Sequence, residues 1–379
     1  MPEPSNRRDL RLDFFRGVAL VFIFVDHIPE NFLSYFTLQA VAFFDAAEVF
    51  IFISGFTAAI VYGQRLAAKG WLYATAQIWR RAWQLYVAHV FLFVIFIAEV
   101  SYTAMAFNNP MYNEEMRVAD FLDQPYISVI KALLLQFQPT FLDILPLYIV
   151  MMLIFPVILL GISYRPSLVL IPSLAAYLAV QLFGVPVPAY PEGHVWYFNP
   201  LAWQFLFVSG AVLGQFWARG RSLPRLMPAL LPLALVLLGA VLVVRVSWTL
   251  SSLWDGFPAL FLREMWPVNK SNLSPLRLVT FFAAVLVVAA WIGPQARFLR
   301  ARAARPLVVA GQQSLEVFCL GIVLSALGHF VLAEFPHGIA MQLAVNAVGI
   351  LAMLLFAGMI DWYKRMDRAP MVAAGGGAR

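Results

Sequence analysis

The chain has 379 residues, of which 62% are hydrophobic and 12% are charged. Soluble proteins carry about 25% charged residues to cover their surface, so this composition excludes a soluble enzyme and indicates a multi-span membrane protein. The single cysteine, Cys319, excludes an internal disulfide and a cysteine-based metal site, and no metal site of another kind is expected. The net charge of +6 is explained below by topology, and no nucleic-acid partner is expected.

Apolar segments of the length needed to cross a bilayer, roughly 17 to 25 residues, recur along nearly the whole chain. Each is predicted to be a helix, because the backbone in lipid must satisfy its own hydrogen bonds and the segments are too long for barrel strands. We predict an all-α polytopic membrane protein with about ten transmembrane helices. The predicted spans are Leu12–Ile28, Ala46–Tyr62, Gln84–Tyr102, Phe141–Ser163, Ser167–Phe183, Leu201–Ala218, Pro228–Val246, Leu276–Trp291, Ser314–Leu332 and Gly338–Trp362.

The basic residues in the connections alternate between the two sides of this arrangement. Most of the 26 Lys and Arg residues fall on one side, which the positive-inside rule makes cytoplasmic. Both termini are therefore predicted to be cytoplasmic. Residues 1–363 are predicted to form a single transmembrane domain, and residues 364–379 a flexible cytoplasmic tail. The opposite connections hold only Arg117, Lys131, Arg263 and Lys270.

The first span carries two ionisable residues that would share a helix face. A charge inside a span costs at least about 2.5 kcal/mol, which makes it a functional candidate. Arg16 and His27 are eleven residues apart, so at about 100° per residue they point the same way, roughly 16 Å apart along the axis. Two alternatives stay open: Arg16 could extend to the inner surface, and His27 could be an interfacial residue.

Three acidic residues lie near the predicted depth of His27. Asp45 and Glu48, three residues apart at the start of the second span, could orient the histidine or receive its charge. They could equally be helix-entry acids stabilised by the helix dipole. Asp26 points about 100° away from His27 on a regular helix. In the same span, Gly55 permits close helix packing.

Further polar groups enter the other spans. Arg80 and Arg81, flanked by tryptophans, suit phosphate and adenine contacts, although an ordinary cytoplasmic anchor has the same composition. Two long outer connections, about 103–140 and 247–275, suit a surface that meets a polar ligand, or are ordinary solvated loops. The polar residues predicted near the outer surface include Asp143, Trp203, Gln204, Arg245 and His329.

Several of these residues form motifs that resemble known families. An Arg, ten residues, then a His, here Arg16 and His27, resembles the first helix of the acyltransferase family 3 membrane enzymes, and Phe50-x-x-x-Ser54-Gly55-Phe56 resembles their second-helix signature. Over about residues 7–65 the chain is more specifically similar to the OpgC proteins. The segment Gly311-x-x-Ser314-Leu315-x-Val317-Phe318-Cys319 supports this likeness near the end of the chain.

The resemblance implies an enzyme of the bacterial inner membrane that succinylates osmoregulated periplasmic glucans. It implies a cytoplasmic acyl-CoA donor and a glycan acceptor on the far side, and we expect no permanently bound cofactor. Carried onto this sequence, it places His27 at the base position and Arg16 at the family's arginine position. Arg80 and Arg81 fall near a basic motif of the wider family but depart from its spacing.

The predictions for the site are therefore as follows. The candidate catalytic residues are His27, Asp26, Glu48 and Asp45; the donor-binding residues are Arg16, Arg80, Arg81, Ser54, Gln313 and Ser314; the acceptor-binding residues are Asp143, Trp203, Gln204, Arg245 and His329. Two alternatives to a glucan succinyltransferase stay open: an acetyltransferase of another envelope polysaccharide, and a glycan or lipid transporter or flippase without covalent chemistry. The partners expected are acyl-CoA, the glucan and the lipid bilayer, and the oligomeric state is left open.

Overall fold

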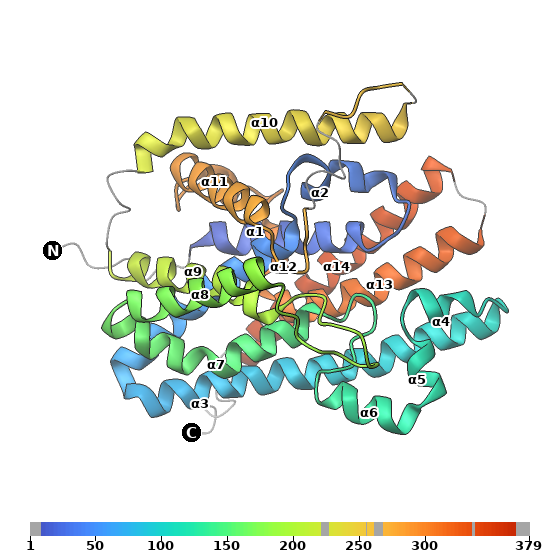
Figure 1. The fold of residues 1–379 in the computed structure, drawn as a ribbon, viewed down its shortest axis with the longest axis horizontal. Helices are drawn as coiled ribbons and strands as arrows, with labels where there is room; N and C mark the ends of the chain where they lie inside the picture. Colours follow the sequence, from blue (N-terminus) through green and yellow to red (C-terminus); the bar gives the residue numbers. More distant parts are fainter. Residues whose placement is uncertain (1–8, 221–226, 255, 261–267, 336–337, 369–379) are drawn as a thin grey trace, which may run out of the picture.

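The computed structural model describes residues 9–220, 227–254, 256–260, 268–335 and 338–368, and every regular element within them is a helix (Figure 1). The predicted all-α class is therefore confirmed. Six described helices are long and apolar enough to cross a membrane, and α8 (Ser167–Phe183) and α11 (Pro275–Trp291) are shorter apolar helices. The chain is a multi-pass membrane protein. The count of about ten spans and the cytoplasmic termini stay predictions.

Most helices begin and end within a few residues of the predicted spans. Helix α14 continues through residues 364–368, which were assigned to the tail, and residues 369–379 lie outside the described part of the chain. Arg263 of the outer connections also lies outside it. The remaining helices that match predicted spans are α1 (Leu10–Asp26), α7 (Ile144–Tyr164), α9 (Pro200–Ala218), α10 (Met227–Leu253), α13 (Ser314–Glu334) and α14 (Ile339–Arg368).

The second and third predicted spans are joined in one long element, α3 (Ala46–Ala106). Its two halves meet at Gly70, where φ of 79° and ψ of 176° are not helical. Glycine tolerates a positive φ because it has no Cβ. Figure 1 shows the chain changing direction there, with the second half of α3 running along the lower edge of the view. The predicted connection between the second and third spans is thus a bend between two helical halves of α3 and not a separate loop.

Helix α1 packs against α3, α13 and a short helix that the sequence did not predict, α12 (Arg305–Gln312). The contact with α12 is a backbone approach between glycines. A Cβ added to Gly17 would lie 2.0 Å from the Leu307 carbonyl oxygen, and one added to Gly311 would lie 1.8 Å from the Asp13 carbonyl oxygen. Small residues allow membrane helices to come this close. This contact fixes α1, and with it the histidine at its end.

Helices α3 and α9 make a second contact of this kind. A Cβ on Gly55 would lie 2.0 Å from the Phe207 carbonyl oxygen, and one on Gly210 would lie 2.3 Å from that of Phe52. The close packing predicted at Gly55 is therefore confirmed. Since α3 starts at the site described below, this contact also sets the position of the first turn of α3.

We expect Gly55→Ala to destabilise the protein, because its methyl group would overlap a backbone oxygen that a side-chain rotation cannot move. Overpacking of this kind costs about 1–3 kcal/mol. Thermal unfolding in detergent, followed by size-exclusion chromatography, measures the effect. Gly239→Ala on α10 is the matched control, since nothing lies within 4 Å of a Cβ there. Equal unfolding temperatures for the two variants would contradict the packing argument.

The long connection after α3 is itself helical and folds back on the molecule. It contains α4 (Met111–Glu115), α5 (Ala119–Asp123) and α6 (Pro125–Leu133), grouped at one end of α3 in Figure 1. The amide of Thr140 donates to the Met116 carbonyl oxygen at 3.1 Å, which ties the end of this connection to its middle. After α1, η1 (Phe32–Phe36) and α2 (Leu38–Val41) lead to α3. These connections supply many of the residues around the site described below.

Candidate active site

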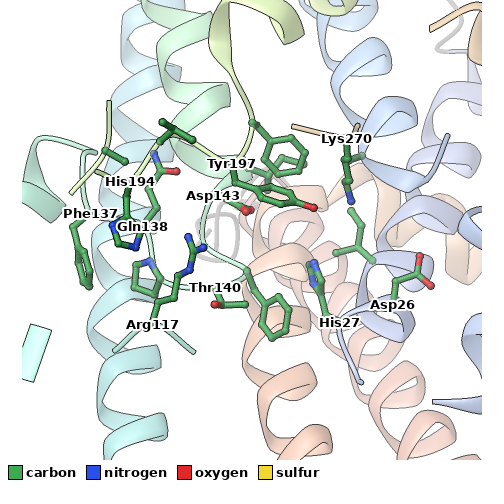
Figure 2. A pocket seen from close by; sticks show the side chains of 18 of the residues that line it. Asp26, His27, Arg117, Phe137, Gln138, Thr140, Asp143, His194, Tyr197 and Lys270 are labelled. Carbon is green, nitrogen blue, oxygen red and sulfur yellow. The ribbon is translucent and has the colours of Figure 1, made fainter. Parts of the chain in front are cut away.

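A cavity of about 380 Å³ lies where the end of α1, the start of α3 and four of the connections between the long helices meet (Figure 2). Its volume is in the range of small-molecule sites. The walls combine charged, amide and aromatic side chains. The lining residues used below are Ile23, Asp26, His27, Gln39, Asp45, Arg117, Gln138, Phe141, Asp143, His194, Tyr197, Lys270 and Phe318.

His27 is the C-cap of α1, and its half-buried ring forms part of the cavity wall. Its Nδ1 is buried, and no group in the described part of the chain hydrogen-bonds to it. The imidazole stacks on Phe141 with ring centroids 4.4 Å apart and a tilt of 33°. Phe141 has φ of 73°, a conformation that is costly for a bulky side chain and is found at functional sites. A strained loop thus holds an aromatic ring against the histidine.

Asp26 also lines the cavity, and its carboxylate has a fixed orientation. The hydroxyl of Thr37 donates to Oδ1 at 2.6 Å, and the Gln39 amide donates to the same oxygen at 2.9 Å. Both donors come from the η1–α2 segment. Both bonds use Oδ1, and no described residue hydrogen-bonds to Oδ2, so that oxygen can accept from a ligand. Asp26 is thus suited to hold a hydroxyl beside His27.

Asp45 and Glu48 form a capping box at the start of α3 and a buried ion-pair network. The Glu48 carboxylate accepts from the Asp45 amide at 2.9 Å. Arg277, at the start of α11, donates to Glu48 Oε1 at 2.6 Å and to Asp45 Oδ2 at 2.9 Å. No hydrogen bond joins either acid to His27 among the described residues. Their role in orienting the histidine stays a prediction, while the helix-entry alternative is what their geometry shows.

Arg277 was missed in the sequence, although it lies inside a predicted span and the rule applied to Arg16 would have selected it. We expect Arg277→Gln to lower the free energy of unfolding by about 3–5 kcal/mol, because two buried carboxylates would lose their partner. Chemical or thermal unfolding in detergent measures this loss. Arg219→Gln, on the exposed end of α9, is the charge-matched control. A loss no larger than that of the control would show that Arg277 is not needed to compensate the acids.

Lys270 stands opposite His27 in the cavity (Figure 2) and was assigned from the sequence only to the outer surface. Its Nζ lies 2.9 Å from Asp45 Oδ2. Burial alone would lower the pKa of Lys270, but the Asp45 carboxylate outweighs it and raises that pKa above its usual value. The ammonium therefore stays charged at physiological pH, and it lines the same cavity as His27.

The loop that carries Lys270 is held from behind by Trp203 and Asn199. The indole of Trp203 donates to the Lys270 and Ser271 carbonyl oxygens, each at 3.1 Å, and the Ser271 carbonyl also accepts from the Asn199 amide at 3.0 Å. Trp203 is fully buried and is not among the residues that line the cavity. The structure therefore places this predicted acceptor-binding residue as support for Lys270.

The other predicted acceptor-binding residues are divided between the cavity and its surroundings. Asp143 lines the cavity. Gln204 instead pairs with Ser173 of α8, accepting from its hydroxyl at 2.6 Å. Arg245 donates to the Gln39 carbonyl oxygen and lines a neighbouring cavity of about 470 Å³. His329 lies 3.3 Å from Glu115 Oε2, outside the cavity lining.

Several cavity residues were not predicted because they come from connections between the long helices. Arg117 was counted only for topology, and Tyr197, His194 and Gln138 lie in segments without helical periodicity. The available signal was the composition of these segments. They are richer in aromatic, amide and charged residues than an ordinary solvated loop needs to be. Burial raises the pKa of Tyr197, so its hydroxyl stays protonated and can donate.

The predicted donor-binding residues form a separate group, and none of them lines the cavity. Arg16 donates to the Thr57 hydroxyl of α3 at 2.8 Å, and Ser54 is buried one turn of α3 away. The charge of Arg81 acts on Glu316, whose partner Lys364 also donates to Gln313 at 2.6 Å. Arg80 is exposed, and Ser314 begins α13. Arg81 thus lies near the α12–α13 junction, and the donor-binding role of these residues stays a prediction.

Comparison with known proteins decides the family. The family model described as "OpgC protein" matches residues 8–365, nearly the whole chain. The chain belongs to the OpgC family. Membership indicates a glucan-modifying, acyltransferase-like role for this OpgC chain. No curated protein and no solved structure matches it.

Proposed function

We propose that this OpgC protein is an inner-membrane O-acyltransferase that moves a succinyl group from cytoplasmic acyl-CoA to a hydroxyl of a periplasmic glucan. The observation that carries the proposal is His27, the C-cap of α1, in the wall of a polar cavity with Asp26 and Lys270 beside it. A sugar hydroxyl is a poor nucleophile until a base removes its proton, and histidine is the commonest base for this task. Family membership supplies the reaction class.

In the proposed reaction, the glucan hydroxyl binds to the free oxygen of Asp26 and faces the imidazole. His27 takes the hydroxyl proton through Nε2, because Nδ1 is buried. The alkoxide oxygen attacks the thioester carbon, and a tetrahedral intermediate forms. The carbon–sulfur bond then breaks, His27 returns the proton to the CoA sulfur, and the acyl group stays on the glucan as an ester. Phe141 keeps the imidazole in place through these steps.

Lys270 is the group best placed to stabilise the negative charge of the tetrahedral intermediate. Its ammonium lines the same cavity as His27 and is held by Asp45 at 2.9 Å, which leaves further N–H groups for the oxyanion. A fixed cation at a developing charge is the arrangement that stabilises such intermediates best. Lys270 therefore takes the oxyanion role in this proposal, and Arg16 and Gln313 keep the donor-binding roles predicted from the sequence.

The acyl group must reach His27 from the side of α1 that holds Arg16. Ile23 and Phe318 line the cavity there, and Ile23 lies between Arg16 and His27 on α1. In the proposal the pantetheine arm passes Arg16 and Ser54 and enters between Ile23 and Phe318. The donor phosphates bind basic residues at the far end, where Arg80 and Arg81 were predicted.

We expect Ile23→Trp to reduce turnover at least about tenfold, because a bulkier side chain would close this entrance to the donor. Moving the reacting groups of an enzyme apart by about 1 Å can lower its rate about a hundredfold. Glucan binding should be unchanged, since the rest of the cavity keeps its lining. Initial rates and equilibrium glucan binding measure the two effects. Phe22→Trp, one position away on another face of α1, is the control. Loss of glucan binding in Ile23→Trp would place the entrance elsewhere.

Reconstitution into vesicles with labelled succinyl-CoA inside and glucan outside tests the function. Label on the glucan, retained after chromatography and released by mild base, supports ester formation. Movement of unmodified glucan or donor without ester formation would identify a transporter and overturn the proposal. Labelled acetyl-CoA in the same assay addresses the acetyltransferase alternative, because a preference for acetyl-CoA would contradict the succinyl assignment.

A further inference from the structure

A second cavity, of about 360 Å³, lies between α12 and α14, away from the residues around His27. Arg305 begins α12 and Arg302 lies in the turn before it, and Asp361, Trp362 and Arg365 come from the last turns of α14. None of these residues was singled out as a site residue from the sequence, where the basic ones counted only as topology signals. The cavity therefore holds an unassigned group of three guanidinium groups, a carboxylate and an indole.

The charges of this cavity are only partly compensated. Arg365 Nη2 lies 2.6 Å from Asp361 Oδ2, so these two residues form a pair. Neither Arg302 nor Arg305 forms a salt bridge with any residue that the structure describes, and both are exposed. Two guanidinium groups at one wall of a cavity, without a salt-bridge partner in the described part of the chain, are suited to bidentate contacts with phosphate.

The remaining wall suits a nucleobase better than a second anion. The Trp362 side chain is 61% exposed, so its ring is available for stacking. Asp361 can accept from an exocyclic amino group, whereas it would repel a phosphate beside it. A Cβ at Gly358 would meet nothing within 4 Å, so this glycine leaves that side of the cavity open. A lipid phosphate would bind the arginines but would make no favourable contact with the Asp361 carboxylate.

The cavity is joined to the predicted donor-binding residues through the same two helices. Lys364, next to Arg365, donates to Gln313 at 2.6 Å, and Gln313 follows the last residue of α12. Helix α12 in turn packs on α1 through Gly17, beside Arg16. A molecule bound by its nucleotide between α12 and α14 would therefore have its remaining length close to the helix that ends at His27.

We propose that this cavity binds the adenosine phosphate portion of the acyl-CoA donor, with the phosphates on Arg302 and Arg305 and the adenine between Trp362 and Asp361. The inference rests on the proposed function for the identity of the donor. It assigns the nucleotide to α12 and α14, and Arg80 and Arg81 of α3 then serve as the positive-inside anchor that their composition also allows. Arg365 positions Asp361.

Equilibrium binding of unacylated CoA and of adenosine 3′,5′-bisphosphate to the purified full chain tests the assignment. We expect Arg302→Gln with Arg305→Gln to weaken both ligands at least about tenfold. Gly358→Leu, which fills the cavity without changing charge, should weaken them similarly. Turnover at saturating donor should fall far less than donor KM rises, because the acyl group still reaches His27. Arg297→Gln with Arg300→Gln, on η2 (Arg297–Arg300), is the charge-matched control.

The outcomes separate this inference from the proposed function. Unchanged CoA binding in the Arg302 and Arg305 variant, or an equal loss in the Arg297 and Arg300 control, would overturn the site. A loss confined to Arg80→Gln with Arg81→Gln would place the nucleotide on α3. If phosphatidylglycerol but not CoA displaces adenosine 3′,5′-bisphosphate from the protein, the cavity is a lipid site and the assignment is overturned. Failure of the wild type to acylate glucan while it binds CoA here would instead contradict the proposed function.

Discussion

His27→Gln is expected to reduce acyl transfer to glucan by about 10²–10⁴-fold, the range that a positioned general base contributes. The amide keeps the approximate size and polarity of the imidazole and cannot carry the proton. CoA binding should be unchanged, because no predicted donor-binding residue lines the cavity that holds His27. Label transfer from succinyl-CoA, together with CoA binding in detergent, measures both quantities.

The matched control is His89→Gln. His89 is a buried histidine of α3 that lies outside the cavity, and neither of its ring nitrogens has a hydrogen-bond partner among the described residues. The His89→Gln variant therefore measures how the loss of a buried imidazole affects folding and yield. Equal transfer by wild type and His27→Gln would remove the base from the mechanism. An equal loss in both variants would show that the effect came from folding.

The stacking of Phe141 on His27 could not be predicted from the sequence. A phenylalanine at the start of a predicted apolar span is expected to face lipid or the core, and nothing in the sequence indicates a positive φ. The span prediction found His27 because helical periodicity is a local property of the chain. The ring that contacts it depends on how a connection of nearly forty residues folds back, through bonds such as that from Thr140 to Met116.

The acidic residues show a second limit of sequence-based prediction. Their spacing predicts that Asp45 and Glu48 share a helix face, and the structure agrees, because both are held by Arg277. The spacing does not reveal which cation arrives from more than two hundred residues away in the chain. Arg16 contacts Thr57 of α3, and His27 lines the same cavity as Asp45, the N-cap of α3, while their common helix face stays a prediction. Local periodicity is thus predictable, whereas long-range pairing is not.

Lys270→Met is expected to reduce the turnover number by about 10²–10³-fold, the loss found when one group that stabilises an oxyanion is removed. Methionine keeps the length of the side chain and removes its charge. Substrate KM should change little, because the charge is needed at the transition state and not in the bound substrate. Lys131→Met is the matched control, since Lys131 donates to Gln136 and does not line the cavity. Initial rates at varied donor concentration separate turnover from KM.

A purely structural role for Lys270 makes a different prediction, since its Nζ lies 2.9 Å from Asp45 Oδ2 and could serve only to neutralise that carboxylate. In that case the double variant Lys270→Met with Asp45→Asn should recover most of the activity, because the acid that needed compensation is gone. If Lys270 stabilises the oxyanion, the double variant stays as slow as Lys270→Met. Lys270→Arg should then recover part of the turnover, because it returns a cation to the same wall. Recovery in the double variant would therefore assign the lysine to the ion-pair network of α3 and α11 and leave the oxyanion to another group.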